Sequence, residues 1–326
     1  LHLSIRRQRQ MCIRDRQILS LLFLLGAFFF VGRISSVSDK KDSVVSVSVE
    51  REKYPLLATR LFIDNPNDRI INFSQLRNSI EDHAKNNSVE GSIYFEYLPT
   101  GTSIRVGAEK REVAASLMKL PAAMSLYKAS ELGRIDLDTK IYLKQEWLDS
   151  AYGDLYQKGA GYSLTLREAA EVMLTNSDNT ALKAVATNIP PVQNTEDNPF
   201  ASLDIDIVQN YNLTVSISAR SYSSVLKCLY FSCYLNRSNS QELLGYLDKS
   251  VFKSRLRAGV PDNSIPIAHK VGNYTQDTQS DCGIVYLPKR NYILCVMLKA
   301  EDNPEGDKKI VDISKIVYEF MEKLPD

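Results

Sequence analysis

A serine and a lysine three residues apart, Ser116 and Lys119, form a pair that could do chemistry in this 326-residue chain. On a helix, side chains three positions apart lie on the same face, so the lysine ammonium group can reach the serine hydroxyl. A serine hydroxyl needs a base to become a nucleophile, and a lysine with a lowered pKa can serve as that base. The pair therefore predicts nucleophilic acyl transfer.

The Ser-x-x-Lys spacing alone does not select Ser116, because a single match is most often a solvent-exposed helix face. The same spacing recurs at four other places, which are Ser38/Lys41, Ser125/Lys128, Ser224/Lys227 and Ser250/Lys253. Two further motifs lie downstream of Ser116. They are Ser177-Asp178-Asn179 and His269-Lys270-Val271-Gly272-Asn273.

The order Ser-x-x-Lys, Ser-Asp-Asn, Lys-[Thr/Ser]-Gly is typical of penicillin-recognising serine enzymes. On these motifs the chain resembles the class A β-lactamase family and its low-molecular-weight D-alanyl-D-alanine peptidase relatives, over about residues 70–324. Of the five pairs, only Ser116 begins a predicted helix after a predicted hairpin at a suitable distance before Ser-Asp-Asn. The resemblance implies an α/β (α+β) protein of the β-lactamase/transpeptidase-like fold. Such a fold has an antiparallel five-stranded sheet flanked by helices, plus an all-helical lobe.

The resemblance also implies catalytic roles for four residues. Ser116 would attack an amide or lactam carbonyl, and Lys119 would take its proton. The backbone N–H groups of Ser116 and Asn273 would bind the oxyanion. Ser177 would pass a proton to the leaving nitrogen.

Four further residues would bind the substrate. Asn179 would hold Lys119 and an amide of the substrate, and Lys270 would attract the substrate carboxylate. Gly272 has no Cβ, which would let a substrate lie against its strand. Val271 stands where the family has Thr or Ser, so a hydroxyl that would bind the carboxylate is absent.

Two other departures concern the same site. Gln279-Ser280-Asp281 on the next predicted strand contains no arginine that could assist Lys270. No Glu-x-x-Leu-Asn motif, which supplies the deacylating base of class A β-lactamases, occurs between Asn179 and Lys270. The acids of that stretch, Glu196, Asp197, Asp204 and Asp206, stand in a different context, and residues 210–222 are expected to replace the missing loop.

Three functions remain open on these motifs. The first is a β-lactamase whose acyl-enzyme hydrolyses slowly because the deacylating Glu is missing. The second is a D-alanyl-D-alanine carboxypeptidase or transpeptidase acting on peptidoglycan stem peptides. The third is a non-catalytic module that senses β-lactams or cell-wall peptides.

The periodicity of apolar residues predicts the elements that position these motifs. Residues 91–107 alternate around Pro99-Thr100-Gly101 and predict a β-hairpin, and further strands are expected near 266–274, 281–287 and 291–299. Helices are expected near 75–86, 116–132, 166–174, 181–189, 221–235, 241–248 and 308–324. Thr165 is expected to cap the helix at 166–174 and Thr180 the helix at 181–189. Together they predict a catalytic domain over residues 54–326, with a helical lobe at about 127–250.

Other chemistries are not favoured. The chain has 40 basic and 39 acidic residues, so it lacks the positive charge expected of a nucleic-acid binder. Neither a zinc motif nor a phosphate-binding loop occurs, and no metal or cofactor is expected. His269 alternates away from Lys270 and is expected to be a core histidine, which excludes a Ser–His–Asp triad. The domain is expected to be a monomer.

The cysteines are expected to remain unbridged. Cys228 and Cys233 lie on one predicted helix and would point about 140° apart. Cys282 and Cys295 fall on paired strands and could face each other, but buried thiols are the favoured state.

The first 53 residues differ from the rest. Residues 1–16 are rich in arginine, and the peptide Met11-Cys12-Ile13-Arg14-Asp15-Arg16 resembles a translated sequencing adapter, so this tail is expected to be either non-native or cytoplasmic. Residues 17–33 are apolar and predict a signal peptide or membrane anchor, and residues 34–53 predict a linker. An extracytoplasmic domain follows from this layout.

Overall fold

The computed structural model describes residues 56, 71–107, 109–210, 214–274, 278–300 and 303–324. The predicted tail, anchor and linker at 1–16, 17–33 and 34–53 lie outside them. Among the residues described, no helix is long and apolar enough to cross a membrane.

The main sheet is built from both ends of the domain. In the described part of the chain its five antiparallel strands run in the order β2-β1-β10-β9-β8. Their bounds are β1 Glu90–Tyr97, β2 Thr102–Val106, β8 Ile267–Tyr274, β9 Thr278–Val285 and β10 Tyr292–Lys299. This confirms the predicted hairpin and the three later strands, and it places β8, which carries Lys270, at an edge of the sheet.

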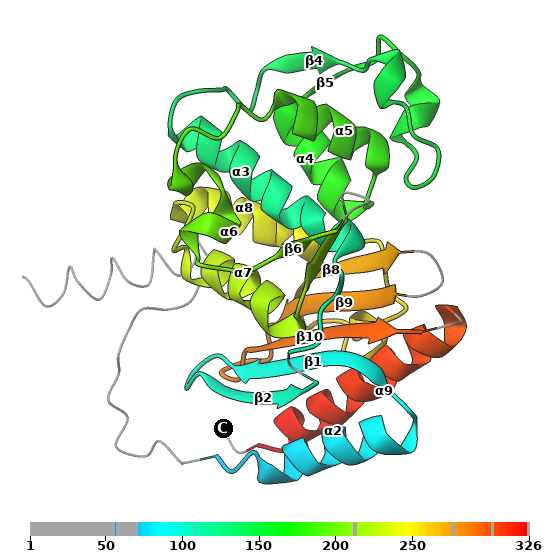
Figure 1. Cartoon of the computed structure of the whole chain (residues 1–326). Coiled ribbons are helices and arrows are strands. Elements are labelled where there is room, and N and C mark those ends of the chain that lie inside the picture. Colours follow the sequence, from blue (N-terminus) through cyan, green and yellow to red (C-terminus); the bar gives the residue numbers. More distant parts are fainter. Residues whose placement is uncertain are drawn as a thin grey trace, which may run out of the picture. The chain divides into compact units, whose positions relative to one another are not determined.

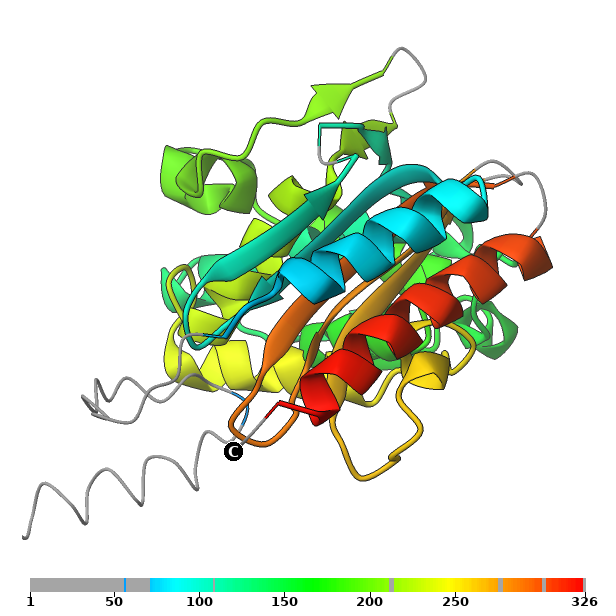
Figure 2. The same ribbon diagram turned by 90° about the horizontal axis from the view of Figure 1, so that it is seen from below.

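Two helices cover one face of this sheet, α2 (Ser74–Asn86) and α9 (Asn303–Glu322), as Figure 2 shows. Apolar side chains at helical spacing, among them Ile310, Ile313 and Val317, enter a core shared with the outer sheet face. The opposite face contributes Ala268, Ile284 and other side chains to a larger core beneath the helical lobe. Successive residues of β8 therefore point alternately to α9 and to the lobe.

The lobe on the other face is mainly helical (Figure 1). Its helices are α3 (Lys119–Glu131), α4 (Leu166–Thr175), α5 (Asn179–Asn188), α6 (Pro199–Ser202), α7 (Ala219–Phe231) and α8 (Arg237–Asp248). The prediction of an all-helical lobe is wrong, because two small sheets accompany the helices. One pairs β4 (Lys140–Tyr142) with β5 (Ser163–Thr165), and the other joins β3 (Glu112–Val113), β7 (Val215–Ile217) and β6 (Val208–Gln209).

Capping residues determine where two of these helices begin. Thr165 caps α4 as predicted, through a reciprocal capping box with Glu168. Helix α5 begins two residues earlier than predicted, because Asp178, and not Thr180, supplies the cap. The Oδ1 of Asp178 accepts from the backbone N–H of Ala181 at 2.8 Å.

Both predictions of unbridged cysteines are wrong. Helix α7 ends at Phe231, and Ser232 in a left-handed conformation (φ 54°) turns the chain back, so that Cys233 lies next to Cys228 and forms a disulfide with it. The predicted angle of about 140° between the two cysteines assumed a helix that continues through Cys233, whereas α7 ends at Phe231. Cys282 and Cys295 are directly opposite each other on β9 and β10 and also form a disulfide.

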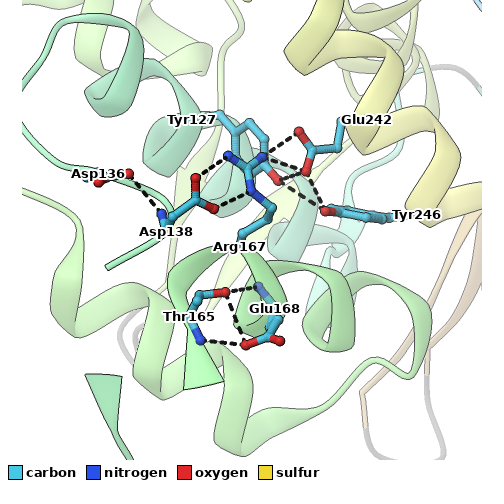
Figure 3. Close-up of polar contacts among 8 residues, drawn as sticks. All are labelled: Tyr127, Asp136, Asp138, Thr165, Arg167, Glu168, Glu242 and Tyr246. Carbon is cyan, nitrogen blue, oxygen red and sulfur yellow. Dashed lines mark hydrogen bonds and ion pairs between the residues drawn. The ribbon is translucent and has the colours of Figure 1, made fainter. Parts of the chain in front are cut away.

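A polar network joins three helices of the lobe (Figure 3). The carboxylate of Glu242 on α8 accepts from both hydroxyls of Tyr127 and Tyr246, at 3.0 and 2.5 Å. The guanidinium of Arg167 on α4 bonds both oxygens of Glu242 at 2.7 Å and also pairs with Asp138. Because Tyr127 on α3 is fully buried, its hydroxyl depends on this carboxylate for a partner.

Replacing Glu242 with alanine should lower the free energy of unfolding by about 2 kcal/mol, since it removes the carboxylate that accepts from the buried Tyr127 hydroxyl and leaves Arg167 paired with Asp138 alone. The measurement is denaturant unfolding followed by circular dichroism. Glu171→Ala is the control. Within the described part of the chain, the side chain of Glu171 pairs with Lys249 at the surface, so its loss should change stability by less than about 0.5 kcal/mol. Equal effects of the two variants would contradict this role of Glu242.

Candidate active site

Ser116 lies in a tight turn that precedes a helix. The 3₁₀ turn η1 (Ala115–Met118) leads directly into α3, whose first residue is Lys119. Ala115 has a positive φ of 48°, a conformation that L-residues rarely adopt outside functional turns. The hydroxyl of the buried Tyr222 donates to the carbonyl of Leu117 at 3.1 Å and fixes the turn from below.

The Ser-Asp-Asn motif forms a second strained turn, between α4 and α5. Ser177 has a positive φ of 56°. The buried carboxylate of Asp178 holds the turn, since one oxygen caps α5 and the other accepts from the N–H of Leu155 at 2.9 Å. Gly153 lies so close that a Cβ there would stand 2.1 Å from Asp178 Oδ2. The neighbouring loop is thereby locked against the motif.

Lys119 points at this second turn. Its Nζ donates to the carbonyl and the Oγ of Ser177, the latter at 3.2 Å, and to Asn179 Oδ1 at 2.8 Å. Burial lowers the pKa of Lys119 to about 8, although the negative charges of Asp178 and Asp149 oppose the shift. A lysine in this state can exchange a proton near neutral pH.

Lys270 reaches the same hydroxyl from the sheet. Its Nζ donates to Ser177 Oγ at 2.8 Å and to the carbonyl of Val271 at 3.1 Å. Burial, and then the positive charge of Lys119, holds the pKa of Lys270 well below its usual value. Ser177 Oγ therefore bridges two buried amines, and a hydroxyl so placed can relay a proton between them.

Burial separates Lys119 from the lysines of the other Ser-x-x-Lys pairs. Lys119 is 1% exposed. Lys128 and Lys227 instead lie near the surface and pair with Glu131 and Glu96, and Lys253 is exposed. The pair at Ser38 falls outside the described residues. Where the pairs can be compared, the selection of Ser116 agrees with the environment of its lysine.

Gly272 lets β8 approach the turn that carries Ser116. A Cβ at this position would stand 2.9 Å from the carbonyl oxygen of Ala114 and 3.1 Å from the side chain of Leu117. The role of Gly272 toward a substrate stays a prediction. Asn273 follows at the exposed end of the contact. Because β8 is an edge strand, its outward N–H groups are available to a ligand.

An arginine from outside the next strand lies near enough to Lys270 for its positive charge to lower the pKa of that lysine. Arg255 comes from the segment before β8 and is 5% exposed. Its guanidinium donates to the carbonyls of Ser280 and Gly272, at 2.8 and 3.3 Å, and pairs with Asp307 on α9. Arg255 could not be predicted from the sequence, because it lies in an irregular segment, where periodicity carries no signal.

His269 alternates away from Lys270, as predicted, and it is buried. Its Nδ1 lies 2.9 Å from Oδ1 of Asp281, and Oδ2 of the same carboxylate accepts from the N–H of Leu256. Val271 is 7% exposed and lies opposite Asp281. His269 is therefore a core residue, as predicted.

Two stacked aromatic side chains lie near Lys270. The ring of Tyr152, from the loop beside Asn179, stacks on Phe252 with the ring centroids 5.9 Å apart. Phe252 in turn lies 5.7 Å from the ammonium of Lys270. The backbone carbonyl of Tyr152 accepts from the N–H of Asn179 at 3.0 Å. No sequence motif predicted the place of Phe252.

The segment after α5 supplies no carboxylate bonded to Lys119 or Asn179 among the described residues. Strands β6 and β7 pair with each other, residues 211–213 between them lie outside the description, and β7 continues to β3. The acids considered from sequence are engaged or placed elsewhere: Asp197 pairs with Arg134, and Asp206 pairs with Arg111. A short hairpin thus occupies part of the segment expected to replace the class A loop.

Residues 75–321 match the family model described as "Beta-lactamase enzyme family". This chain belongs to that family. It is 24% identical over 241 residues to a β-lactamase of Bacillus licheniformis, covering 69% of this chain and 77% of the relative.

Two solved structures agree with the assignment. The structure of PBP-A superposes with a TM-score of 0.69 at 25% identity, covering 77% of this chain and 97% of PBP-A. A β-lactamase from Sphaerobacter thermophilus has a TM-score of 0.70 at 20% identity, covering 78% and 100% of the two chains. The β-lactamase/transpeptidase-like fold is therefore confirmed.

Proposed function

We propose that this protein is a serine acyl-transfer hydrolase that forms a covalent acyl-enzyme at Ser116 with β-lactams. The observation that carries the proposal is the burial of Lys119 one helical turn from Ser116, with a pKa lowered to about 8. A variant of PBP-A has been solved as an acyl-enzyme complex with penicillin G. That complex supports the proposal that this chain also forms an acyl-enzyme.

In the proposed reaction, Ser116 Oγ bonds to the carbonyl carbon while its proton passes to the neutral amine of Lys119. The N–H groups of Ser116 and Asn273 stabilise the oxyanion. As the C–N bond breaks, Ser177 gives its proton to the leaving nitrogen and regains one from Lys119 or Lys270, both of which bond its oxygen. Proton and charge balance without a further reactant.

Deacylation is proposed to be slow. Water must attack the ester, and the described residues contain no carboxylate within hydrogen-bond distance of Lys119. Lys119 must then act as the base again, and burial disfavours the positive charge that it gains when it accepts the proton. A D-alanyl-D-alanine peptidase with stem peptides as substrate is the second candidate, favoured by this lack of a dedicated base and by the likeness to PBP-A.

We also propose that the domain works outside the cytoplasmic membrane. The apolar segment at residues 17–33, which predicts a signal peptide or membrane anchor, supports this location. Two disulfides support it further, because such bonds persist in oxidising compartments.

Fluorescent penicillin should label the protein with a stoichiometry of one, and the label should remain for many minutes. Intact-mass spectrometry and gel fluorescence measure both quantities. Ser116→Ala should abolish labelling, whereas Ser125→Ala, in a neighbouring Ser-x-x-Lys pair, should leave it unchanged. No label on the wild type would contradict acylation and favour a non-catalytic module. Rapid steady-state hydrolysis of a chromogenic cephalosporin would contradict slow deacylation.

Replacing Val271 with threonine should restore the hydroxyl found in the family and speed acylation by a carboxylate-bearing penicillin roughly fivefold to tenfold. The methyl ester of the same penicillin should show no gain, because it lacks the charge that the hydroxyl would bind. Val106→Thr on β2, at the opposite edge of the sheet, is the control. An equal gain for acid and ester would contradict this role of position 271.

A further inference from the structure

Asp149 lies behind the site, on the loop between the 3₁₀ turn η2 (Gln145–Trp147) and Tyr152. Its side chain is 22% exposed. One oxygen accepts from the N–H of Ala151 at 2.9 Å and from Asn179 Nδ2 at 3.4 Å. The other pairs with Lys183 on α5 at 2.9 Å. Asp149 itself lies outside the three motifs, and its contact with Asn179 links it to the Ser-Asp-Asn motif.

The two contacts of Asn179 define how its amide is oriented. Lys119 Nζ is a donor, so the amide oxygen must face it, and the amide nitrogen then faces Asp149. A carboxylate can only accept from that nitrogen, whereas a flipped amide would place two oxygens against each other. Asp149 therefore favours the single orientation in which Asn179 accepts from Lys119.

The same carboxylate acts on Lys119 through charge. It is separated from Lys119 by one amide group, and its field is partly neutralised by Lys183. The other charged groups that face Lys119 are Asp178, which raises its pKa as Asp149 does, and Lys270 from the sheet. The carboxylate of Asp178 accepts from the N–H groups of Ala181 and Leu155. The carboxylate of Asp149 instead pairs with Lys183, whose side chain is 44% exposed.

We infer that Asp149 is a positioning residue of this site, which orients the Asn179 amide toward Lys119 and, together with Lys183, sets the electrostatic field at that amine. The inference rests on the proposed acyl-transfer function only for its kinetic readout. It adds to that function two residues outside the motifs, Asp149 and Lys183, whose charges shift the protonation equilibrium of Lys119.

The test is a pair of variants with opposite expected effects. Asp149→Asn keeps the shape and removes the negative charge, so Lys119 should lose its proton more readily and acylation at pH 7 should become about threefold faster. Lys183→Met removes the neutralising charge, so Lys119 should hold its proton more tightly and acylation at pH 7 should become about threefold slower. The acid limb of the pH–rate profile should move down in the first variant and up in the second.

Two further variants separate orientation from general damage. Asp149→Ala removes both charge and orientation, so its maximal acylation rate at high pH should fall, whereas that of Asp149→Asn should be retained. Asp154→Asn on the same loop is the matched control, since Asp154 is exposed and its recorded side-chain contact is with Gln157. It should leave the profile unchanged.

A substrate-free readout distinguishes the failure of this inference from failure of the proposed function. With ¹³C-labelled lysine, nuclear magnetic resonance follows the titration of Lys119 in each folded variant. The Lys119 titration should move to lower pH in Asp149→Asn and to higher pH in Lys183→Met, even if no penicillin reacts. Shifts of the same sign, or none, would overturn the inference. Absence of labelling together with opposite shifts would instead overturn only the proposed function.

Discussion

The structure of the site depends on one serine hydroxyl that lies between two buried lysines. Ser177 Oγ is 3.2 Å from Lys119 Nζ and 2.8 Å from Lys270 Nζ. Two protonated lysines beside the same buried hydroxyl raise the free energy of the folded state, because burial disfavours each charge and the two charges repel each other. Lowered pKa values for both lysines relieve that cost, and they also make proton transfer possible near neutral pH.

The rest of the fold supports this arrangement by bringing three separate segments together. The turn that carries Ser116, the Ser-Asp-Asn turn and β8 come from different parts of the chain. Each of the two turns has a residue of unusual backbone conformation, and β8 has a glycine at the point of contact. Ala115 and Ser177 have positive φ, and Gly272 allows β8 to contact the turn that carries Ser116. Strain of this kind persists only where the surrounding packing holds it. Here Tyr222 beneath Leu117 and Asp178 at the start of α5 provide that support.

Much of this could be predicted from sequence, because the relevant signals are local. Alternation predicted the five strands, Thr165 predicted the start of α4, and the three motifs identified the residues that meet at Ser177. The residues Arg255, Phe252 and Asp149 could not be predicted, since they lie in irregular loops whose positions follow from tertiary packing. The Cys228–Cys233 bridge was missed for a related reason: the end of α7 depends on a left-handed Ser232, which has no strong sequence signal.

The central claim is that Lys119, lowered to a pKa of about 8, is the base for Ser116. The pH dependence of the acylation rate of the wild-type protein, followed by time-resolved intact-mass spectrometry with penicillin, tests it most directly. Since a protonated Lys119 cannot accept the proton, the account predicts a rate that falls as the pH decreases through about 8. A rate constant that stays the same from about pH 6 to about pH 9 would contradict it.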